Sequence, residues 1–482
     1  MADGDLVVRL DMPLPAALPV GRGTAVLCLG ACFHRREPLG ALEVLVDGQP
    51  HQPTAWRMPR PDLFQALPPE LSNCYRGGFW ATVPIEKRDR PGVVEIDLAA
   101  RLASGARVRA PLGRIEVIEA AAPPARESAV GRIAVCMATF DPDMDLLRVQ
   151  VESLRAQSDT DWTCIISDDC STPARFDEIS DLVAGDPRFR VSRSERRLGY
   201  YRNFERALGM LPPEADLVAL CDHDDRWYPE KLELLRGALG SAQLVYSDQR
   251  LVDRNGRVLR ETLWEGRRNN HTNLASLLVA NTITGAATLF RRELAELALP
   301  FPETPGWQFH DHWLGLVALA SGDVAYVDRP LYDYVQHGAA VVGQAMEVDP
   351  GHADEPSPTR GWRAAYFYGY LPRALLAQAL LARCSGRLTR PKRRALRRVA
   401  SADRTPLGLA WLAARPLRRL AGRNETLGTE SEFARGILWR HLIRLRTGRR
   451  ERPEGSPYDA SCPPLHVDTL GQERLARWRA GI

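Results

Sequence analysis

The sequence predicts an α/β protein of three parts: a central, mainly parallel, doubly wound sheet, an N-terminal β-sandwich and a C-terminal helical region. Three observations in its 482 residues carry this prediction. Short strands separated by turn signals fill the first 120 residues, as in β-sandwiches. Strand-like and helix-like segments then alternate, which is the order of parallel sheets covered by helices. Beyond residue 361, leucines recur at helical spacing among many arginines.

Residues 1–120 are expected to form the β-sandwich. Segments 42–46, 79–84 and 93–98 have the alternating or apolar character of strands, and glycine-containing turn signals lie beside them. No group of residues suited to catalysis is visible in this part, which favours a structural or interaction role over contact with a sugar. Residues 121–130, rich in alanine and proline, are expected to be a linker.

Residues 131–345 are expected to form the central sheet and its helices. Apolar residues three and four positions apart predict helices, first at 147–154 and later at 232–239. The continuous apolar run at 133–138 predicts a strand buried on both faces. Further strands are expected at residues 163–166, 189–191, 217–220 and 244–246. Ligands of such sheets bind at the carboxyl ends of the strands, so the functional residues are sought there.

Residues 346–360, rich in proline and acids, are expected to be a second linker, and residues 361–482 a basic helical region. Arginine and lysine cluster at 390–398 and at 444–452. Two interpretations stay open for these helices, docking on anionic lipid or an ordinary solvated basic face.

The composition limits the function. A net charge of +4 is too small to indicate a nucleic-acid partner. No segment has the ~20 apolar residues of a membrane span, and no signal peptide is visible. The nine cysteines are scattered without a CxxC pair, which favours buried, reduced thiols. The protein is therefore expected in the cytoplasm, with peripheral contact to the inner face of the membrane as one interpretation.

Acidic residues cluster directly after two of the predicted strands. Asp168 and Asp169 follow one strand, and Asp222, Asp224 and Asp225 follow another. Like charges gathered at one edge of a sheet repel each other, so each cluster is costly without a cation. Mg²⁺ and Mn²⁺ prefer oxygen ligands. A solvated turn would explain one cluster, but two clusters at strand ends favour a divalent metal.

Seven short motifs extend this pattern in a fixed order, one of them being Cys221-Asp-His-Asp-Asp-Arg-Trp227. The others are residues 135–140, 167–171, 199–203, 284–286, 310–313 and 336–338. Together they resemble the family 2 glycosyltransferases of the GT-A fold, and among these the bacterial cell-surface polysaccharide and rhamnosyl-type enzymes. The resemblance covers residues 131–345, a little under half of the chain. It implies inverting, metal-dependent transfer of a sugar from a nucleotide-sugar donor to a hydroxyl of a glycan or lipid-linked acceptor.

The resemblance also implies roles at the nucleotide end of the site. Thr139 and Phe140 would cradle the base and ribose. Asp169, with Asp168 beside it, would accept a hydrogen bond from the imide of the base, which uracil and thymine both offer, so a UDP- or dTDP-linked donor is favoured. Arg202 would meet the base or the diphosphate, although an ordinary surface arginine on a helix is the alternative.

A second group of roles concerns the metal. Asp222 and Asp224 correspond to the D-x-D pair near the metal and the diphosphate, with Asp224 as a direct ligand. Asp225 would be a ligand or would hold a water molecule. His337 would join the metal or the diphosphate, and a structural histidine is its alternative.

Asp311 is the candidate general base, which takes the proton of the acceptor hydroxyl. It lies at the start of a predicted helix, so a helix N-cap is the alternative role. Thr284 and Gly285 resemble the segment that lets the acceptor approach closely, and Trp313 is assigned to the acceptor side. The two histidines that flank Asp311 would form walls of the acceptor site.

Departures from the family pattern leave other functions open. Cys170 stands where the family commonly has glycine, so either this position needs no positive φ or the loop differs. The motif of processive synthases is absent, which favours addition of one or a few sugars. A nucleotidyltransferase would need a glycine-rich loop where residues 138–141 read Ala-Thr-Phe-Asp. A metal phosphoesterase, or a non-catalytic protein that binds or assembles glycans, would also be compatible with these motifs.

Overall fold

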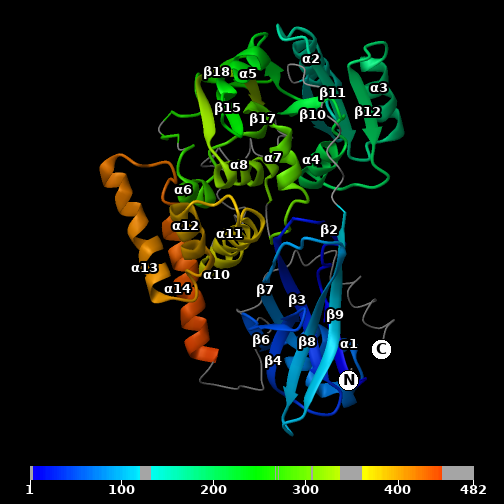
Figure 1. The fold of residues 1–482 in the computed structure, drawn as a ribbon, viewed down its shortest axis with the longest axis vertical. Helices are drawn as coiled ribbons and strands as arrows, with labels where there is room; N and C mark the ends of the chain where they lie inside the picture. Colours follow the sequence, from blue (N-terminus) through cyan, green and yellow to red (C-terminus); the bar gives the residue numbers. More distant parts are fainter. Residues whose placement is uncertain are drawn as a thin grey trace.

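The computed structural model describes residues 4–119, 132–265, 267–269, 271–305, 308–336 and 361–447. The linkers expected at 121–130 and 346–360, and His337, lie outside the described residues. The described parts form a β-sandwich, a sheet covered by helices on both faces, and a group of C-terminal helices between and beside them (Figure 1).

The N-terminal part is a sandwich of two sheets, as expected. The first sheet has the order β1-β3-β7-β6 and the second β2-β9-β8-β4-β5. Short helical segments α1 (Pro61–Ala66) and η1 (Pro69–Arg76) follow β6. The strands are β1 (Leu6–Leu10), β2 (Ala17–Pro19), β3 (Thr24–His34), β4 (Leu39–Val46), β5 (Gln49–His51), β6 (Ala55–Met58), β7 (Gly78–Ile85), β8 (Gly92–Leu102) and β9 (Arg107–Ile118).

Strand β3 is buried on both faces, which explains its unbroken apolar sequence. Val26 and Cys28 point into the core between the two sheets. The alternate residues Leu27 and Leu29 belong instead to the large core that the central part and the C-terminal helices share. Because successive side chains of a strand point to opposite faces, one face of β3 packs inside the sandwich and the other packs against the rest of the molecule.

The central sheet has the order β12-β11-β10-β13-β17-β15-β18-β14, with β16 paired to β15. Strands β12, β11, β10 and β13 are mutually parallel, whereas β17 is antiparallel to both of its neighbours. The strands are β10 (Arg132–Thr139), β11 (Trp162–Asp168), β12 (Phe189–Arg193), β13 (Ala215–Cys221), β14 (Arg226–Trp227), β15 (Leu244–Asp253), β16 (Val258–Arg260), β17 (Thr288–Arg291) and β18 (Val324–Gln336). The predicted α/β sheet is therefore confirmed, and it is mixed: β15 and β18 are also parallel, whereas β14 and β16 pair antiparallel to their neighbours.

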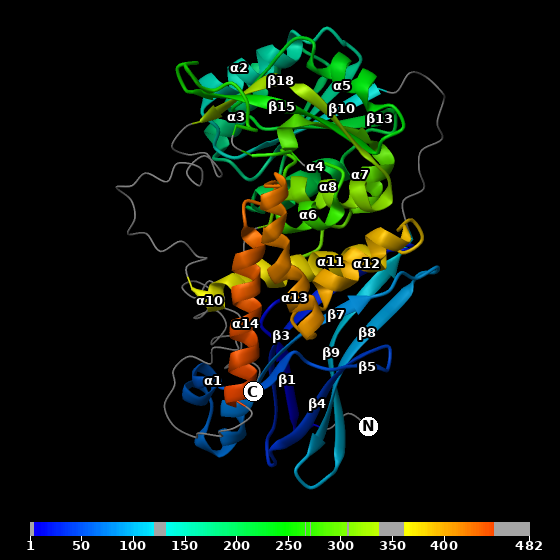
Figure 2. The same cartoon turned by 90° about the vertical axis from the view of Figure 1, so that its left-hand side faces the viewer.

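Helices cover both faces of this sheet, with α2 and α5 on one side and α4, α7 and α8 on the other (Figure 2). Helix α2 shows why they form: Leu147, Val151 and Leu154 make a buried stripe, and Asp143 caps its first turn. The helices are α2 (Met144–Arg155), α3 (Pro173–Val183), α4 (Tyr200–Gly209), α5 (Lys231–Leu239), α6 (Leu274–Val279), η2 (Gly285–Ala287), α7 (Arg292–Ala298) and α8 (His310–Ser321).

The C-terminal part is helical, as expected, and α11 lies between the sandwich and the central sheet (Figures 1 and 2). Its buried Arg383 donates to the carbonyl oxygen of Gly23 in the sandwich at 2.9 Å and to that of Pro300 in the central part at 2.7 Å. Among the described helices, none combines the length and apolar character needed to span a bilayer. The elements are α10 (Trp362–Ala364), the π-helical turn η4 (Ala365–Tyr370), α11 (Leu371–Arg383), α12 (Arg390–Ala400), α13 (Pro406–Ala414), η5 (Arg415–Ala421) and α14 (Thr429–Thr447).

Candidate active site

The two acid clusters lie on either side of β10, at the carboxyl edge of the parallel strands. Thr139, the last residue of β10, pairs with Asp168 of β11, and Met137 pairs with Cys221 of β13. Asp222 is the residue after Cys221, so it lies one position beyond the level of Met137. The parallel order of the strands brings the two clusters to one edge, as the sequence predicts.

Asp168 is fully buried at the end of β11 and is held there by hydrogen bonds. Its Oδ1 accepts a hydrogen bond from Thr139 Oγ1 at 3.0 Å, and its Oδ2 accepts one from the Ser171 amide at 2.9 Å. Asn203 of α4, a residue without an assigned role in the sequence analysis, is buried beside them. Its amide donates to the carbonyl oxygens of Ser167 at 2.7 Å and Thr139 at 3.3 Å. These bonds fix the ends of β10 and β11 relative to α4.

Asp169 is buried as well and holds the start of α4. Its two oxygens accept hydrogen bonds from the amides of Leu198 and Gly199. Each carboxylate oxygen has two lone pairs and can accept a second hydrogen bond. Contact of Asp169 with a base therefore stays a prediction. The next residue, Cys170, has a φ of +63°. Of the two alternatives for this position, the one without a positive φ is therefore wrong, and a cysteine adopts the left-handed conformation that suits glycine.

Phe140, directly after β10, is in contact with Arg197. The guanidinium carbon of Arg197 lies 3.7 Å from the centroid of the Phe140 ring, the distance of a cation–π contact. Phe140 is half-buried and Arg197 exposed. Sequence reasoning missed Arg197, because it lies in a run of charged residues with nothing to distinguish it from a solvated arginine.

Asp222, the first of the acids that follow β13, lies close enough to Asp311 to feel its charge. Burial raises the pKa of Asp222 to about 7, and the negative charges of Asp224 and Asp311 contribute to that rise. The pKa of Asp225 is also raised by burial and then by Asp224 and Asp222. These acids come from separate stretches of the chain, the turn after β13 and the first turn of α8, and they converge at one place.

Asp225 also ties this turn to β18. Its Oδ1 accepts a hydrogen bond from the Val335 amide at 3.2 Å. Its Oδ2 is buried and finds no hydrogen-bond donor among the described residues. An acceptor in this state is unfavourable unless a donor or a cation reaches it.

Lys231, at the start of α5, places a buried cation below the acids. Its Nζ donates to the Ala286 carbonyl oxygen at 2.6 Å and lies 3.6 Å from the Trp227 ring centroid and 4.1 Å from that of Tyr332. Burial lowers the pKa of Lys231 to about 7, whereas the nearby ionisable groups of Cys221, Asp225 and Asp222 act to raise it. Sequence reasoning missed this residue. Its one signal is that it lies four positions before Leu235, on the apolar face of the helix.

Asp311 is held in place by two hydrogen bonds from the segment that joins α6 to η2. Its Oδ1 accepts from Asn281 Nδ2 at 3.0 Å and its Oδ2 from the Gly285 amide at 3.2 Å. Burial raises the pKa of Asp311 to about 6. The N-cap of α8 is Phe309, so Asp311 lies in the first helical turn and is not the cap. Asn281 is a further residue that sequence reasoning missed.

Gly285 packs closely against the start of α8, where a side chain would not fit without a shift. A Cβ atom at this position would lie 2.7 Å from His310 Nε2 and 3.5 Å from Asp311 Cβ. The His310 ring stacks on Phe204 at 3.8 Å, and burial lowers the pKa of His310 to about 3, so the ring is neutral. Thr284, half-buried, precedes Gly285. The structure thus brings Thr284 and Gly285 together with Asp311.

The structure places Trp313 in the core, away from these residues. Its side chain is fully buried, and its Nε1 donates to the Ala298 carbonyl oxygen at 2.9 Å. The expectation that Trp313 faces the acceptor is corrected accordingly. The reason is the period of the helix: two residues beyond Asp311, the side chain points into the packing between α8 and α7.

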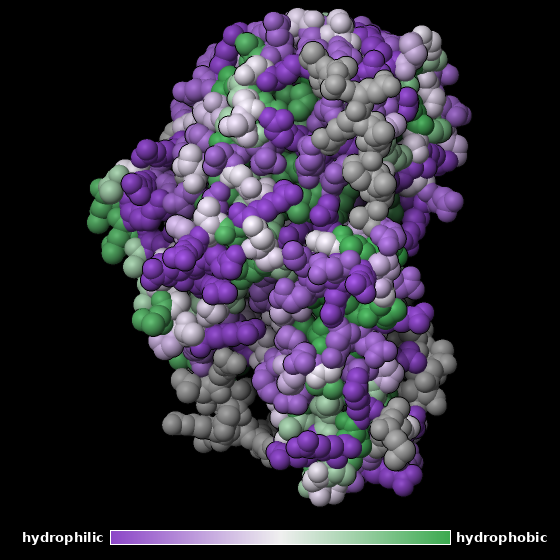
Figure 3. Space-filling model, in the orientation of Figure 1, coloured by the Kyte–Doolittle hydropathy of each residue, from purple (hydrophilic) through white to green (hydrophobic). Residues whose placement is uncertain are grey.

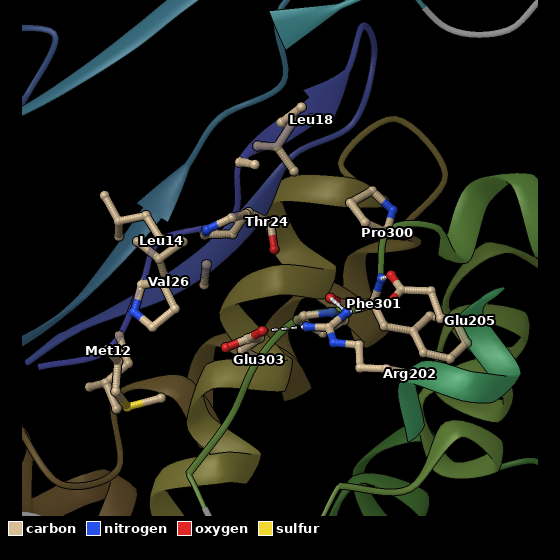
Figure 4. A pocket seen from close by; sticks show the side chains of 17 residues that line it. Met12, Leu14, Leu18, Thr24, Val26, Arg202, Glu205, Pro300, Phe301 and Glu303 are labelled. Carbon is tan, nitrogen blue, oxygen red and sulfur yellow. Dashed lines mark hydrogen bonds and ion pairs between the residues drawn. The ribbon is translucent and has the colours of Figure 1, made fainter. Parts of the chain in front are cut away.

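The structure does not bring Arg202 to the acids either. Its guanidinium forms ion pairs with Glu205 and with Glu303, the latter at 2.7 Å. It lies in the wall of a cavity of about 350 Å³ whose other walls include residues 12–18 and 24–27 of the sandwich (Figure 4). The expected contact of Arg202 with the base or diphosphate is therefore corrected. Arg202 lies at the junction between the sandwich and the central part.

The chemistry of the donor set fits a divalent cation. Asp222 and Asp224 offer the hard oxygen ligands that Mg²⁺ and Mn²⁺ prefer, and Asp225 Oδ2 is a buried acceptor without a donor among the described residues. In the part of the chain that the structure describes, no group of three or more histidine, cysteine, aspartate or glutamate side chains is arranged to hold a metal alone. Mg²⁺ commonly binds through one or two carboxylates together with substrate phosphates, so this set suits a cation that arrives with a diphosphate.

Parts of the chain are similar to known proteins. Residues 134–297 match the family described as Glycosyl transferase family 2. The uncharacterized protein y4gI of Sinorhizobium fredii (strain NBRC 101917 / NGR234) is 30% identical over 128 residues, or 26% of this chain. The chain spans only 14% of the length of that relative.

Two solved structures of S. aureus TarS 1-349 are also similar. The complex with UDP-GlcNAc matches over 67% of this chain and 93% of its own, at 16% identity and a TM-score of 0.42. The complex with UDP matches over 68% of this chain and 94% of its own, at 15% identity and a TM-score of 0.37. The segment matched by the family runs from β10 into α7 and contains both acid clusters, so residues 134–297 of this chain form a family 2 glycosyltransferase domain.

Proposed function

We propose that the protein is an inverting glycosyltransferase that moves a sugar from a UDP- or dTDP-linked donor to a hydroxyl of a glycan or lipid-linked acceptor. The observation that supports this most is that Asp222 lies close to both Asp224 and Asp311. The negative charges of these two residues add to the effect of burial and raise the pKa of Asp222. Such a transfer needs one set of carboxylates for a cation at the leaving diphosphate and another for the proton of the acceptor.

In the proposed reaction Asp311 is the general base. It takes the proton of the acceptor hydroxyl while that oxygen attacks the anomeric carbon. The bond between the anomeric carbon and the diphosphate oxygen breaks, and its electron pair leaves with the nucleoside diphosphate. Asn281 and the Gly285 amide orient the carboxylate. With a pKa of about 6, Asp311 is ionised at neutral pH and close to the value that suits a general base.

Asp222 and Asp224 would hold Mg²⁺ or Mn²⁺ together with oxygens of the donor diphosphate. When bound, the cation neutralises the charge that develops on the leaving group. His337 as a further ligand remains part of the proposal. Lys231 lies below the acids and offsets part of their mutual repulsion while the donor is absent.

Thr139, Phe140 and Asp169 are proposed to bind the nucleoside. Asp168 and Asn203 hold Thr139 in place from below, so their part is to keep this end of the site in shape. The donor base would stack on Phe140 in the position that Arg197 occupies in the structure. We propose a role in cell-surface polysaccharide synthesis, with the enzyme in the cytoplasm and in peripheral contact with the inner face of the membrane.

A donor screen tests the reaction. Purified protein is incubated with UDP-, dTDP- and GDP-sugars and with Mg²⁺ or Mn²⁺, and release of the nucleoside diphosphate is measured. Asp224→Ala is expected to abolish release, whereas Asp216→Ala, at the opposite end of β13, is expected to retain it. Cleavage of simple phosphate esters without any sugar donor would favour a phosphoesterase instead. Unchanged glycan production in cells that carry Asp224→Ala would contradict the enzymatic proposal.

A second pair of variants tests the base. Asp311→Asn is expected to bind donor normally while transfer falls on the order of 10²-fold or more. Asp323→Asn, just beyond the other end of α8, is the control and is expected to behave like the wild type. If Asp311→Asn lost donor affinity to the same extent as transfer, Asp311 would belong to the metal or nucleotide end.

A further inference from the structure

Helix α12 carries its positive charge on one face. Its opposite face is apolar and packs inward through Leu396 and Val399, which are fully buried. The outward residues, together with Ser401, line a shallow hollow of about 430 Å³. They are Arg390, Arg393, Arg394, Arg397 and Arg398.

These five arginines are not neutralised within the described part of the protein. Among the described residues none of them forms an ion pair, whereas arginines on other helices do: Arg155 pairs with Glu152 and Arg292 with Glu296. Like charges three and four positions apart on a helix repel each other. This face is therefore stabilised by any occupant that brings several negative charges close together.

Unusually exposed leucines lie on the next two elements. Leu407 of α13 is 84% exposed, and Leu417 and Leu420 of η5 are 64% and 87% exposed. Hydrophobic side chains stand out along the edge that α13 and η5 form, with hydrophilic ones beside them (Figure 3). A group of apolar side chains that is surrounded by charge commonly marks a site of interaction with a protein or a membrane.

The helix that carries the arginines and the elements that carry the leucines are neighbours in the C-terminal part. Helices α13 and α14 run side by side in Figures 1 and 2, and α12 lies against α11. Arg398 of α12 contacts the Trp411 ring of α13 at 5.9 Å, which holds the two helices together. The turn with the exposed leucines is fixed from behind, because Arg415 pairs with Glu430 and Arg418 with Glu425.

We propose that α12, α13 and η5 form a docking surface for an anionic lipid bilayer. The arginines of α12 would contact lipid phosphates, and Leu407, Leu417 and Leu420 would enter the apolar layer beneath. An anionic bilayer supplies both the negative charge and the apolar depth that this surface lacks. A second copy of the chain supplies the apolar contact alone, and it would bring two arginine faces of like charge together.

This docking surface is linked to the acceptor side of the site. Arg418 of η5 donates to Ser276 Oγ of α6 at 2.7 Å. Two residues after α6 ends, Asn281 holds the carboxylate of Asp311. These contacts connect the docking surface to the segment that positions Asp311. The inference makes the membrane contact of the proposed function specific, but it does not depend on the reaction.

Flotation with vesicles tests the surface. The full chain is mixed with vesicles of neutral phosphatidylcholine, or with vesicles in which about a third of the lipid is phosphatidylglycerol, at low and high salt. Binding is expected to the anionic vesicles alone and to be lost at high salt, where charges are screened. The double variant Arg394→Gln/Arg397→Gln is expected to lower the partition coefficient about 25-fold, at about fivefold for each basic residue.

Matched variants separate lipid binding from other causes. Leu417→Ser/Leu420→Ser is expected to weaken binding on the order of tenfold or more, because each leucine loses its apolar transfer. Arg148→Gln/Arg175→Gln removes two charges from α2 and α3 and is expected to leave binding unchanged. All of these variants are expected to keep the nucleotide release of the wild type in solution, so lipid binding and reaction are tested independently.

Three results would overturn the proposal. The first is equal binding to neutral and anionic vesicles, and the second is anionic binding that the α12 variant leaves intact. The third is a wild-type dimer in solution that the leucine variant converts to a monomer, which would assign the surface to a second copy of the chain.

Discussion

Replacement of Gly285 by alanine tests whether a contact that only glycine permits positions the start of α8. The added Cβ would lie 2.7 Å from His310 Nε2 and 3.5 Å from Asp311 Cβ. The Gly285 amide also donates to Asp311, so the same residue packs against the candidate base and binds it. A change here acts on Asp311 without altering its chemistry.

The size of the effect follows from these distances. His310 would have to withdraw from 2.7 Å to at least the 3.4 Å of an ordinary contact, a movement of about 0.7 Å. It cannot turn away freely, because its ring is stacked on Phe204 at 3.8 Å. The first turn of α8, which carries both His310 and Asp311, would therefore have to move instead. Misplacement of a catalytic group by about 1 Å costs on the order of 10²-fold in rate, and overpacking costs about 1–3 kcal/mol of stability.

The assay compares Gly285→Ala with Gly369→Ala, whose Cβ would lie 3.1 Å from the Phe433 ring in the C-terminal helices. Both are expected to lower the melting temperature. Only Gly285→Ala is expected to lower kcat, by roughly 10²-fold, with the KM for the donor unchanged. A wild-type kcat for Gly285→Ala, or an equal loss of kcat in both variants, would refute the argument that this glycine positions Asp311.

Three further predictions follow from other features. Because burial raises the pKa of Asp311 to about 6 and the base acts ionised, kcat/KM is expected to fall as the pH is lowered through about 6; a pH–rate profile that stays flat well below that pKa would contradict this. Cys170→Gly is expected to raise the free energy of unfolding in urea by about 1 kcal/mol, because a left-handed φ strains any residue with a Cβ; a lower value would mean that the thiol has a structural role. Arg383→Met is expected to lower the free energy of unfolding by about 3 kcal/mol, because the carbonyls of Gly23 and Pro300 lose their buried donor; an unchanged unfolding midpoint would exclude that role.

The strands that flank the site could be predicted because their signal is local. The apolar runs that became β10, β11 and β13 are each long enough to show burial on both faces. Strand β17 could not be predicted in the same way. It has four residues, and its antiparallel position between β13 and β15 comes from pairing with partners that are distant in the chain.

The same difference between local signals and contacts with distant residues applies to the candidate site. The placement of Asp222 and Asp224 near Asp168 could be predicted because the ends of parallel strands meet at one edge of the sheet. The role of Asp311 came from the resemblance to the family. The direction of a side chain on a helix depends on its neighbours in space. Arg202 turns toward Glu303, which is 101 residues away, and no local pattern reveals that partner.

Asn281 and Lys231 escaped prediction for a related reason. Asn281 belongs to the stretch after β15, whose path is set by packing and not by periodicity. From the sequence alone, Lys231 resembles a charged residue on the surface of a helix. Only the tertiary structure shows that Trp227 and Tyr332 enclose it. A charged residue on the apolar stripe of a helix is the one sign that such burial leaves in a sequence.

The position of α11 has a consequence for how this protein can be divided into fragments. One side of the helix closes the outer face of β3 and the other closes the underside of the glycosyltransferase domain, so its leucines, Leu27 and Trp313 belong to a single core. A fragment cut after β18 would expose both surfaces to water and is expected to aggregate. Transplanting residues 134–297 into another host would therefore require an apolar helix in the recipient to replace α11, whatever happens to the chemistry of the site.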